Sequence, residues 1–222
     1  MKIILEFLSL TFILYPKVLW FQYREERFIR KKLYPIARFK QVDRRFKSVY
    51  RLSNPYKVHK AHVKRSGKGS LHSYGETPLS VFQELFQKVN LRSSDVFVDL
   101  GCGRGRGVLY ASECYQCLSF GVERIPQFCH KTNQVAKDLP SKLLCQDISE
   151  FDFSIGDIFY FYSLCMNEEE ILSFMPLFSC MKKGAKLVTV SFSLQSFSQE
   201  FQVVGSWMSM FPWGEGEVFI HV

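Results

Sequence analysis

The chain has 222 residues, a hydrophobic fraction of 47% and a formal net charge of +8. This length supports one domain with a full core, and the absence of repeats and low-complexity tracts excludes a solenoid or a disordered chain. The seven cysteines show no paired framework, so we expect reduced, cytosolic thiols. Cys114 and Cys117 could begin a zinc site, but no second ligand pair follows, and we predict no metal.

The N-terminus begins with an apolar stretch from Ile3 to Phe21, which Glu6, Pro16 and Lys17 interrupt. Its longest run without charge or proline, Phe7 to Tyr15, is nine residues long. A helix that crosses a bilayer requires about 20 apolar residues. Three alternatives stay open: a helix on a membrane surface, a spanning helix, or a helix packed on its own domain. Because the following flank is basic, we expect a cytoplasmic protein, with the segment able to attach it to the inner face of a membrane.

Charge divides the chain into two parts. From Lys17 to Lys68 there are 17 basic and 3 acidic residues, a net charge of +14, whereas Gly69 to Val222 has 11 basic and 17 acidic residues, a net charge of −6. We therefore predict a helical, basic N-terminal arm over residues 1–70 and a catalytic domain over residues 71–222. The arm could meet nucleic acid, anionic lipid or an acidic partner, or it could be a solvated helical surface.

Periodicity predicts the elements in chain order. A helix is expected over residues 3–33, mixed helix and loop over 34–70, a loop over 71–78 and a helix over 79–90. Strands and helices then alternate, which predicts an α/β, Rossmann-like, mostly parallel seven-stranded sheet with helices on both faces and a C-terminal antiparallel hairpin. The predicted strands are 95–100, 118–123, 142–146, 157–162, 186–192, 201–210 and 217–222, and the intervening helices are 105–116, 126–138 and 168–181.

The strongest motif is Val96 to Gly107, VFVDLGCGRGRG. An apolar strand ends in Asp99, and a glycine turn with Gly101 and Gly103 follows. Glycine suits the carboxyl edge of a parallel sheet, where the backbone must approach a ligand closely. The motif therefore predicts a cofactor site. Asp99 would repel a pyrophosphate, which argues against a dinucleotide.

Two further apolar runs also end in an acid. Leu118 to Val122 precedes Glu123, which stands 24 positions after Asp99, and a third short run precedes Asp147. An acid about 20 residues after the glycine turn typically accepts hydrogen bonds from a ribose. The ends of three parallel strands would thus present acids to one crevice. A ligand with a cationic aminoacyl end, a ribose and an exocyclic amine fits them, and S-adenosylmethionine has all three.

These motifs resemble those of class I S-adenosylmethionine-dependent methyltransferases. The similar segments are Asp99 to Gly103, Gly121 to Glu123 and Gln146 to Ile148. Upstream, Tyr74-Gly-Glu-Thr-Pro78 and the helix after it resemble the non-SET histone lysine methyltransferases, in which such a loop folds over the methionine end of the cofactor. The group is also similar to small bacterial methyltransferases and to mitochondrial enzymes that methylate a lysine of an ATP synthase subunit.

The resemblance implies a set of cofactor-binding residues. Arg104 and Arg106 start a helix, where the macrodipole disfavours cations, so we expect a use such as pairing with Glu76 or with the cofactor carboxylate, with solvent exposure as the alternative. The predicted cofactor-binding residues are Tyr74, Gly75, Glu76, Thr77, Asp99, Gly101, Gly103, Arg106, Glu123, Asp147 and Ile148.

The fourth strand departs from the histone-methylating group. That group's paired asparagines align with Phe161 and Tyr162. Aromatic faces can still stabilise a sulfonium or a methylated ammonium. We predict Tyr162, at the strand end, and Tyr74 as catalytic residues, and interpret the other aromatic residues of this strand as buried core.

The predicted reaction is direct in-line transfer of a methyl group to a nitrogen, most simply the lysine of a protein substrate. It requires no covalent intermediate and no protein base, and the histidines, His59 among them, lie away from the motifs in sequence. An RNA or small-molecule methyltransferase and a cofactor-binding scaffold without catalysis stay as alternatives. The fourth strand lacks the Asn/Asp-Pro-Pro-Tyr signature of base-amine methylation, which disfavours the first.

Overall fold

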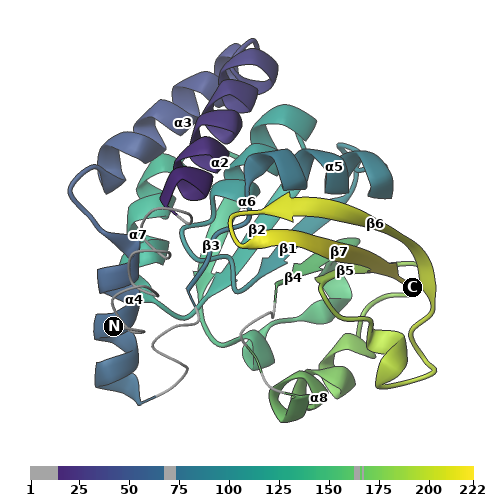
Figure 1. The fold of residues 1–222 in the computed structure, drawn as a ribbon. Coiled ribbons are helices and arrows are strands. Elements are labelled where there is room, and N and C mark those ends of the chain that lie inside the picture. The colour runs from purple at the N-terminus through teal and green to yellow at the C-terminus, as the bar shows by residue number, and fades with distance from the viewer. Residues whose placement is uncertain (1–14, 68–73, 163–165, 167) are drawn as a thin grey trace, which may run out of the picture.

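The structure, a computed structural model, describes residues 15–67, 74–162, 166 and 168–222. Its centre is a seven-stranded sheet in the order β3-β2-β1-β4-β5-β7-β6 (Figure 1). The first five strands are parallel, and β7 pairs antiparallel with both β5 and β6. The strands are β1 (Val96–Leu100), β2 (Leu118–Glu123), β3 (Ser141–Cys145), β4 (Ile158–Phe161), β5 (Lys186–Val190), β6 (Val203–Phe211) and β7 (Gly214–His221).

Helices cover both faces of this sheet (Figure 1). They are α2 (Tyr15–Phe28), α3 (Ala37–Tyr50), α4 (Pro55–Ser66), α5 (Leu79–Val89), α6 (Arg106–Tyr110), α7 (Pro126–Val135) and α8 (Glu168–Phe178). Two π-helical segments, η2 (Ile29–Leu33) and η3 (Ala111–Tyr115), continue α2 and α6, and three short 3₁₀ turns are η4 (Ile148–Glu150), η5 (Phe153–Ile155) and η6 (Leu194–Ser196).

Alternate residues of the central strands supply two separate cores. Phe97 of β1 and Tyr160 of β4 pack with α5 and the end of α6. Their neighbours Val98 and Phe159 face the opposite way, into a core with α8 and the turn η5. Strands buried on both faces read as continuous apolar runs, which explains why these segments were recognisable as parallel strands.

The predicted fold class is confirmed, and the differences are local. The expected helix 105–116 changes from α-helical to π-helical at Ala111. The mixed region 34–70 contains two distinct helices. The second has a sequence signal that predicts its start, because Asn54 accepts a hydrogen bond from the Lys57 amide at 3.1 Å and Pro55 occupies the first turn. Gly67, with a φ of 69°, ends it in a left-handed cap.

The N-terminal arm shares its core with the rest of the chain. Ile29, Leu33 and Phe39 lie in the same buried cluster as α5 and the sheet. On α3, Phe46 and Tyr50 pack with residues of α6 and α7. The division at residue 70 stays a prediction, and the described part of the arm is joined to the rest of the chain by these two clusters.

The apolar N-terminal stretch lies largely outside the described residues, which begin at Tyr15. At its described end Phe21 is buried, whereas Val18, Leu19 and Trp20 are exposed. Within the described ranges, no helix combines the length and apolar character that crossing a membrane requires. Membrane attachment and cytoplasmic location therefore stay predictions.

The shared core leads to a stability prediction. Replacing Ile29, which is 1% exposed, with Ala should lower the free energy of unfolding by about 2–5 kcal/mol, because it leaves a cavity between the arm and α5. Leu19→Ala on the preceding α2, where the side chain is 47% exposed, is the matched control and should change it little. Denaturant unfolding followed by circular dichroism measures both. A separate early transition, or an unchanged midpoint for Ile29→Ala, would contradict a common core.

Candidate cofactor site

Two adjoining cavities lie at the carboxyl edge of the parallel strands. The larger has a volume of about 300 Å³ and the smaller about 170 Å³, and they share Gly75, Gly101 and Tyr162 in their walls. Every predicted site residue lines one or the other. The larger cavity contains Tyr74, Gly103, Glu123, Asp147 and Ile148, and the smaller contains Glu76, Thr77, Asp99 and Arg106.

The glycine turn after β1 forms the floor between the cavities. Gly101 and Gly103 have φ angles of 78° and 55°, a left-handed conformation that side chains rarely adopt. A Cβ atom at Gly103 would also lie 3.4 Å from the Tyr74 ring. The Gly103 amide donates to Glu123 Oε2 at 2.9 Å, so the turn is bonded to the end of β2. Glycine here serves both the backbone conformation and the close approach of Tyr74.

Glu123 is held rigidly at the end of β2. Besides the bond from Gly103, its Oε1 accepts the Ile125 amide at 2.8 Å. Burial raises the pKa of Glu123 to about 7, although these backbone amides oppose the shift. Each carboxylate oxygen keeps a second lone pair for a ligand hydroxyl.

Asp99 is buried at the wall of the smaller cavity. Burial, and then the charge of Glu123, raise the pKa of Asp99 to about 8. Nothing among the described residues offsets these two effects. A cationic ligand group beside Asp99 would favour its charged form.

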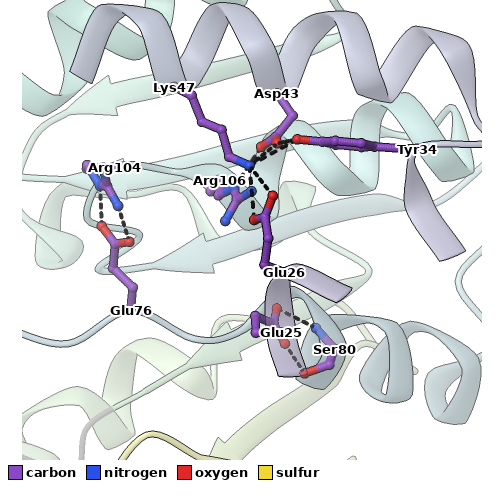
Figure 2. Close-up of polar contacts among 9 residues, drawn as sticks. All are labelled: Glu25, Glu26, Tyr34, Asp43, Lys47, Glu76, Ser80, Arg104 and Arg106. Atoms are coloured by element: carbon purple, nitrogen blue, oxygen red, sulfur yellow. Dashed lines mark hydrogen bonds and ion pairs between the residues drawn. The ribbon is translucent and has the colours of Figure 1, made fainter. Parts of the chain in front are cut away.

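Arg106 joins the smaller cavity to the arm. Its Nε donates to Oδ1 of the buried Asp43 at 2.7 Å (Figure 2). Asp43 also accepts from the Tyr34 hydroxyl at 2.8 Å, and Lys47 Nζ lies 3.3 Å from its Oδ2. Burial alone would raise the pKa of Asp43, but Arg106 and the other partners lower it overall. Arg106 Nη2 is buried and has no hydrogen-bond partner among the described residues, so it is a donor available to an anion.

The YGET segment, residues 74–77, covers the turn and is fixed at several points. Glu76 accepts a hydrogen bond from the Tyr74 hydroxyl. It also accepts from Arg104, whose Nη2 lies 2.5 Å from Oε2 (Figure 2). The Thr77 hydroxyl bonds the Tyr160 hydroxyl at 2.7 Å. Just beyond the segment, α5 has no cap from its own N-cap residue, and Glu25 of α2 accepts from the Ser80 amide and hydroxyl at 3.2 and 2.6 Å.

Tyr162 stands directly after β4, between the two cavities. Its hydroxyl accepts from Trp213 Nε1 at 2.7 Å, and its ring lies 6.0 Å from that of Phe211. The C-terminal hairpin thus orients this tyrosine. Phe161, the other position where the related group has asparagine, is fully buried in the α8 core and lines neither cavity.

The third strand end forms the far wall of the larger cavity. Asp147 Oδ1 accepts the Ser149 amide at 3.1 Å and thereby caps the turn η4. Ile148, the first residue of that turn, and Gln146 lie on either side of it in the wall. The capping role explains why an acid follows β3 and leaves the second oxygen of Asp147 outside this cap.

Among the residues at or beside the site that sequence reasoning missed, three stand out for their contacts. His59 of α4 lines the larger cavity, with its ring 5.5 Å from that of Tyr74, and burial lowers its pKa, which keeps it neutral near pH 7. Tyr160 looked like core, yet its hydroxyl reaches Thr77. Tyr50 lies against Arg104. None has a local sequence signal, because each reaches the site through packing between distant segments.

The described part of the chain contains no arrangement typical of a metal-binding site. Within the described residues, no group of three or more His, Cys, Asp or Glu side chains is arranged to hold a metal ion. Six cysteines are free thiols there, Cys114 and Cys117 included, and Cys165 lies outside the described residues.

Comparison with solved structures identifies the fold. An RNA methyltransferase from Salinibacter ruber, solved with S-adenosyl-L-homocysteine, matches with a TM-score of 0.54 and 20% identity, over 66% of this chain and 92% of that one. The M1A22 tRNA methyltransferase TrmK of B. subtilis matches with a TM-score of 0.52 and 9% identity, over 63% and 64% of the two chains. The fold is therefore that of the class I S-adenosylmethionine-dependent methyltransferases.

Comparison of sequences narrows the resemblance. Residues 56–160 match the family model described as histone methylation protein DOT1. The H3 lysine-79 specific histone-lysine N-methyltransferase of Dictyostelium discoideum is 27% identical over 136 residues, which cover 53% of this chain and 7% of that protein. The predicted resemblance to the non-SET histone lysine methyltransferase group is thus confirmed. The chain spans only a small part of that relative.

The buried Asp99 leads to a pH-dependent stability prediction. With a pKa of about 8 when folded and 3.8 as its ordinary value, Asp99 holds its proton more tightly in the folded protein. The folded state binds more protons between these values, so stability should fall as the pH rises through this window. Asp99→Asn removes the cost of keeping this carboxyl protonated when folded, and it should raise the Tm relative to wild type clearly more at pH 9 than at pH 5, because most of the window lies above pH 5.

Calorimetric or fluorescence melting at the two pH values measures this difference. Asp138→Asn, at an exposed acid, is the control and should shift the Tm equally at both. An Asp99→Asn shift that is the same at pH 5 and pH 9 would show that Asp99 ionises in the folded protein as it does in water.

Proposed function

We propose that this chain is an S-adenosylmethionine-dependent methyltransferase that transfers a methyl group to a lysine of a protein substrate. The observation that carries the proposal is the pair of adjoining cavities at the carboxyl edge of the sheet, whose polar groups match the two ends of that cofactor. The DOT1 match over residues 56–160 supports the choice of acceptor.

The larger cavity fits an adenosine. Its volume of about 300 Å³ lies at the lower end of the range typical of ligand pockets. Glu123 would accept hydrogen bonds from the ribose hydroxyls through its remaining lone pairs. Asp147 would accept from the exocyclic amine of the adenine, and Ile148 would contact the ring. Gly101 and Gly103 leave the floor open where side chains would fill it.

The smaller cavity fits the aminoacyl end. Asp99, whose charge is disfavoured by burial, would be stabilised by the cationic amine. Arg106 Nη2, the buried donor without a partner in the described part of the chain, would bind the carboxylate. Two opposite charges held in one cavity thus complement a zwitterionic group.

When bound, the cofactor supplies an electrophilic methyl group on a sulfonium. The chain's own contribution is to position the acceptor, exclude water and stabilise charge. Tyr162, fixed by Trp213, presents an aromatic face at the wall shared by the cavities, where it can stabilise a cation by about 0.5–2 kcal/mol. An apolar, aromatic channel also favours the neutral amine of a lysine, which is the nucleophilic form.

Cofactor binding tests the first part of the proposal. Glu123→Ala should weaken calorimetric binding of S-adenosylhomocysteine by roughly 1–3 kcal/mol, because it removes the acceptor of the ribose hydroxyls. Asp138→Ala, at an exposed acid outside both cavities, should bind as wild type does. Equal affinities for wild type and Glu123→Ala, with both folded, would refute the assigned ribose site.

Turnover tests the role of Tyr162. Tyr162→Ala should lower kcat far more than cofactor affinity, because a cation near the ring develops or moves during transfer. Tyr162→Phe keeps the ring and its contact with Phe211 but loses the hydroxyl that accepts from Trp213, so it should lose less activity than Tyr162→Ala. Both variants are assayed with tritiated cofactor. A loss confined to KM in Tyr162→Ala would assign the ring to ground-state binding alone.

The class of methyl acceptor is identified by the fraction of the products that carries the tritiated methyl group. A host-cell lysate is incubated with enzyme and tritiated cofactor, and the products are separated into protein, RNA and small molecules before mass spectrometry. Methyl-lysine in protein supports the proposal. Label confined to RNA or small molecules would replace the substrate but not the methyltransferase, and tight cofactor binding without any transfer would favour a scaffold.

A further inference from the structure

Helix α3 of the arm reaches the cofactor site through aromatic rings. Arg104 is the residue between Gly103 and Gly105 of the glycine turn. Its guanidinium lies 5.2 Å from the ring centre of Phe46 and 5.0 Å from that of Tyr50. Both rings are buried. The side chain of Arg104 is 20% exposed, so this cation–π contact is partly shielded from water.

The rings that hold Arg104 are themselves fixed. The single proton of the Tyr50 hydroxyl is shared between the Phe128 carbonyl of α7, at 3.0 Å, and the Thr132 hydroxyl, at 2.9 Å. The Thr132 hydroxyl in turn donates to the Arg104 carbonyl at 2.7 Å. The side chain of Arg104 is therefore held by α3 and its backbone by α7, and Tyr50 joins these two helices.

The Nε and Nη2 edge of the Arg104 guanidinium binds the YGET segment through Glu76. Arg104 binds both oxygens of Glu76, and the Tyr74 hydroxyl donates to the same carboxylate. A two-point contact between a planar guanidinium and a carboxylate fixes orientation as well as distance. Gly75 lies between these two bonded residues in sequence and lines both cavities.

We propose that Phe46 and Tyr50 of α3 are positioning residues for the cofactor site: they hold Arg104, and Arg104 holds the YGET segment in place through Glu76. The arm thereby completes the site, in addition to any contact that it makes with partners. Its effect on cofactor binding rests on the function proposed above, whereas its effect on the YGET segment does not.

A matched pair of substitutions on one helix tests this proposal. Phe46→Leu removes the ring over Arg104 and keeps an apolar side chain. Phe39→Leu makes the same change at a buried ring of α3 that contacts Tyr110, 5.4 Å away between ring centres, and lies outside both cavities. The two variants should lose similar stability. Only Phe46→Leu should weaken S-adenosylhomocysteine binding, by about fivefold, which corresponds to about 1 kcal/mol.

Hydrogen exchange of a peptide covering residues 74–77 provides the second readout, without ligand. Exchange should be faster in Phe46→Leu than in Phe39→Leu, and faster still in Arg104→Lys, which keeps the charge but loses the two-point contact. Equal exchange in the two leucine variants would overturn the proposal. Faster exchange in Phe46→Leu with no ligand binding even by the wild type would keep the positioning role and reject the proposed function.

Discussion

The backbone turn after β1 is the constraint on which the rest of the site depends. Only a left-handed conformation at Gly101 and Gly103 lets the chain reverse at the sheet edge while its amide still reaches Glu123 on the neighbouring strand. The same lack of side chains lets Tyr74 approach to van der Waals distance. A side chain at either glycine would strain the turn, and one at Gly103 would also press on the Tyr74 ring at 3.4 Å.

Electrostatics explain how a strongly basic arm can pack on this turn. The arm brings Asp43, one of its few acids, to Arg106 at 2.7 Å, and its Glu25 caps α5 through Ser80 (Figure 2). The arm's aromatic residues also contact Arg104 by cation–π interaction. This contact stabilises a cation that the dipole of α6 alone would disfavour at the start of the helix. Buried ion pairs add little net stability, but they specify one orientation. The apolar contacts of Ile29, Leu33 and Phe39 supply the stabilisation.

The sequence was sufficient for the parallel sheet, because its strands are continuous apolar runs buried on both faces and each is followed by a turn or helix signal. It also predicted the residues that line the cavities, since Asp99, Glu123 and Asp147 each end a strand and parallel strands end at one edge. His59, Tyr50 and Tyr160 escaped it for a physical reason. Their positions depend on how α3 and α4 pack and on how far a tyrosine hydroxyl extends from the core. Neither feature produces a hydrophobic periodicity or a residue spacing that the sequence would show.

The most direct test is a crystal structure of the protein with S-adenosylhomocysteine. Adenosine should lie in the larger cavity, with its ribose hydroxyls on Glu123 and its adenine beside Asp147 and Ile148. The aminoacyl end should lie in the smaller cavity, with its amine at Asp99 and its carboxylate on Arg106. A ligand bound at another surface, or one whose aminoacyl end avoids Asp99 and Arg106, would contradict this placement.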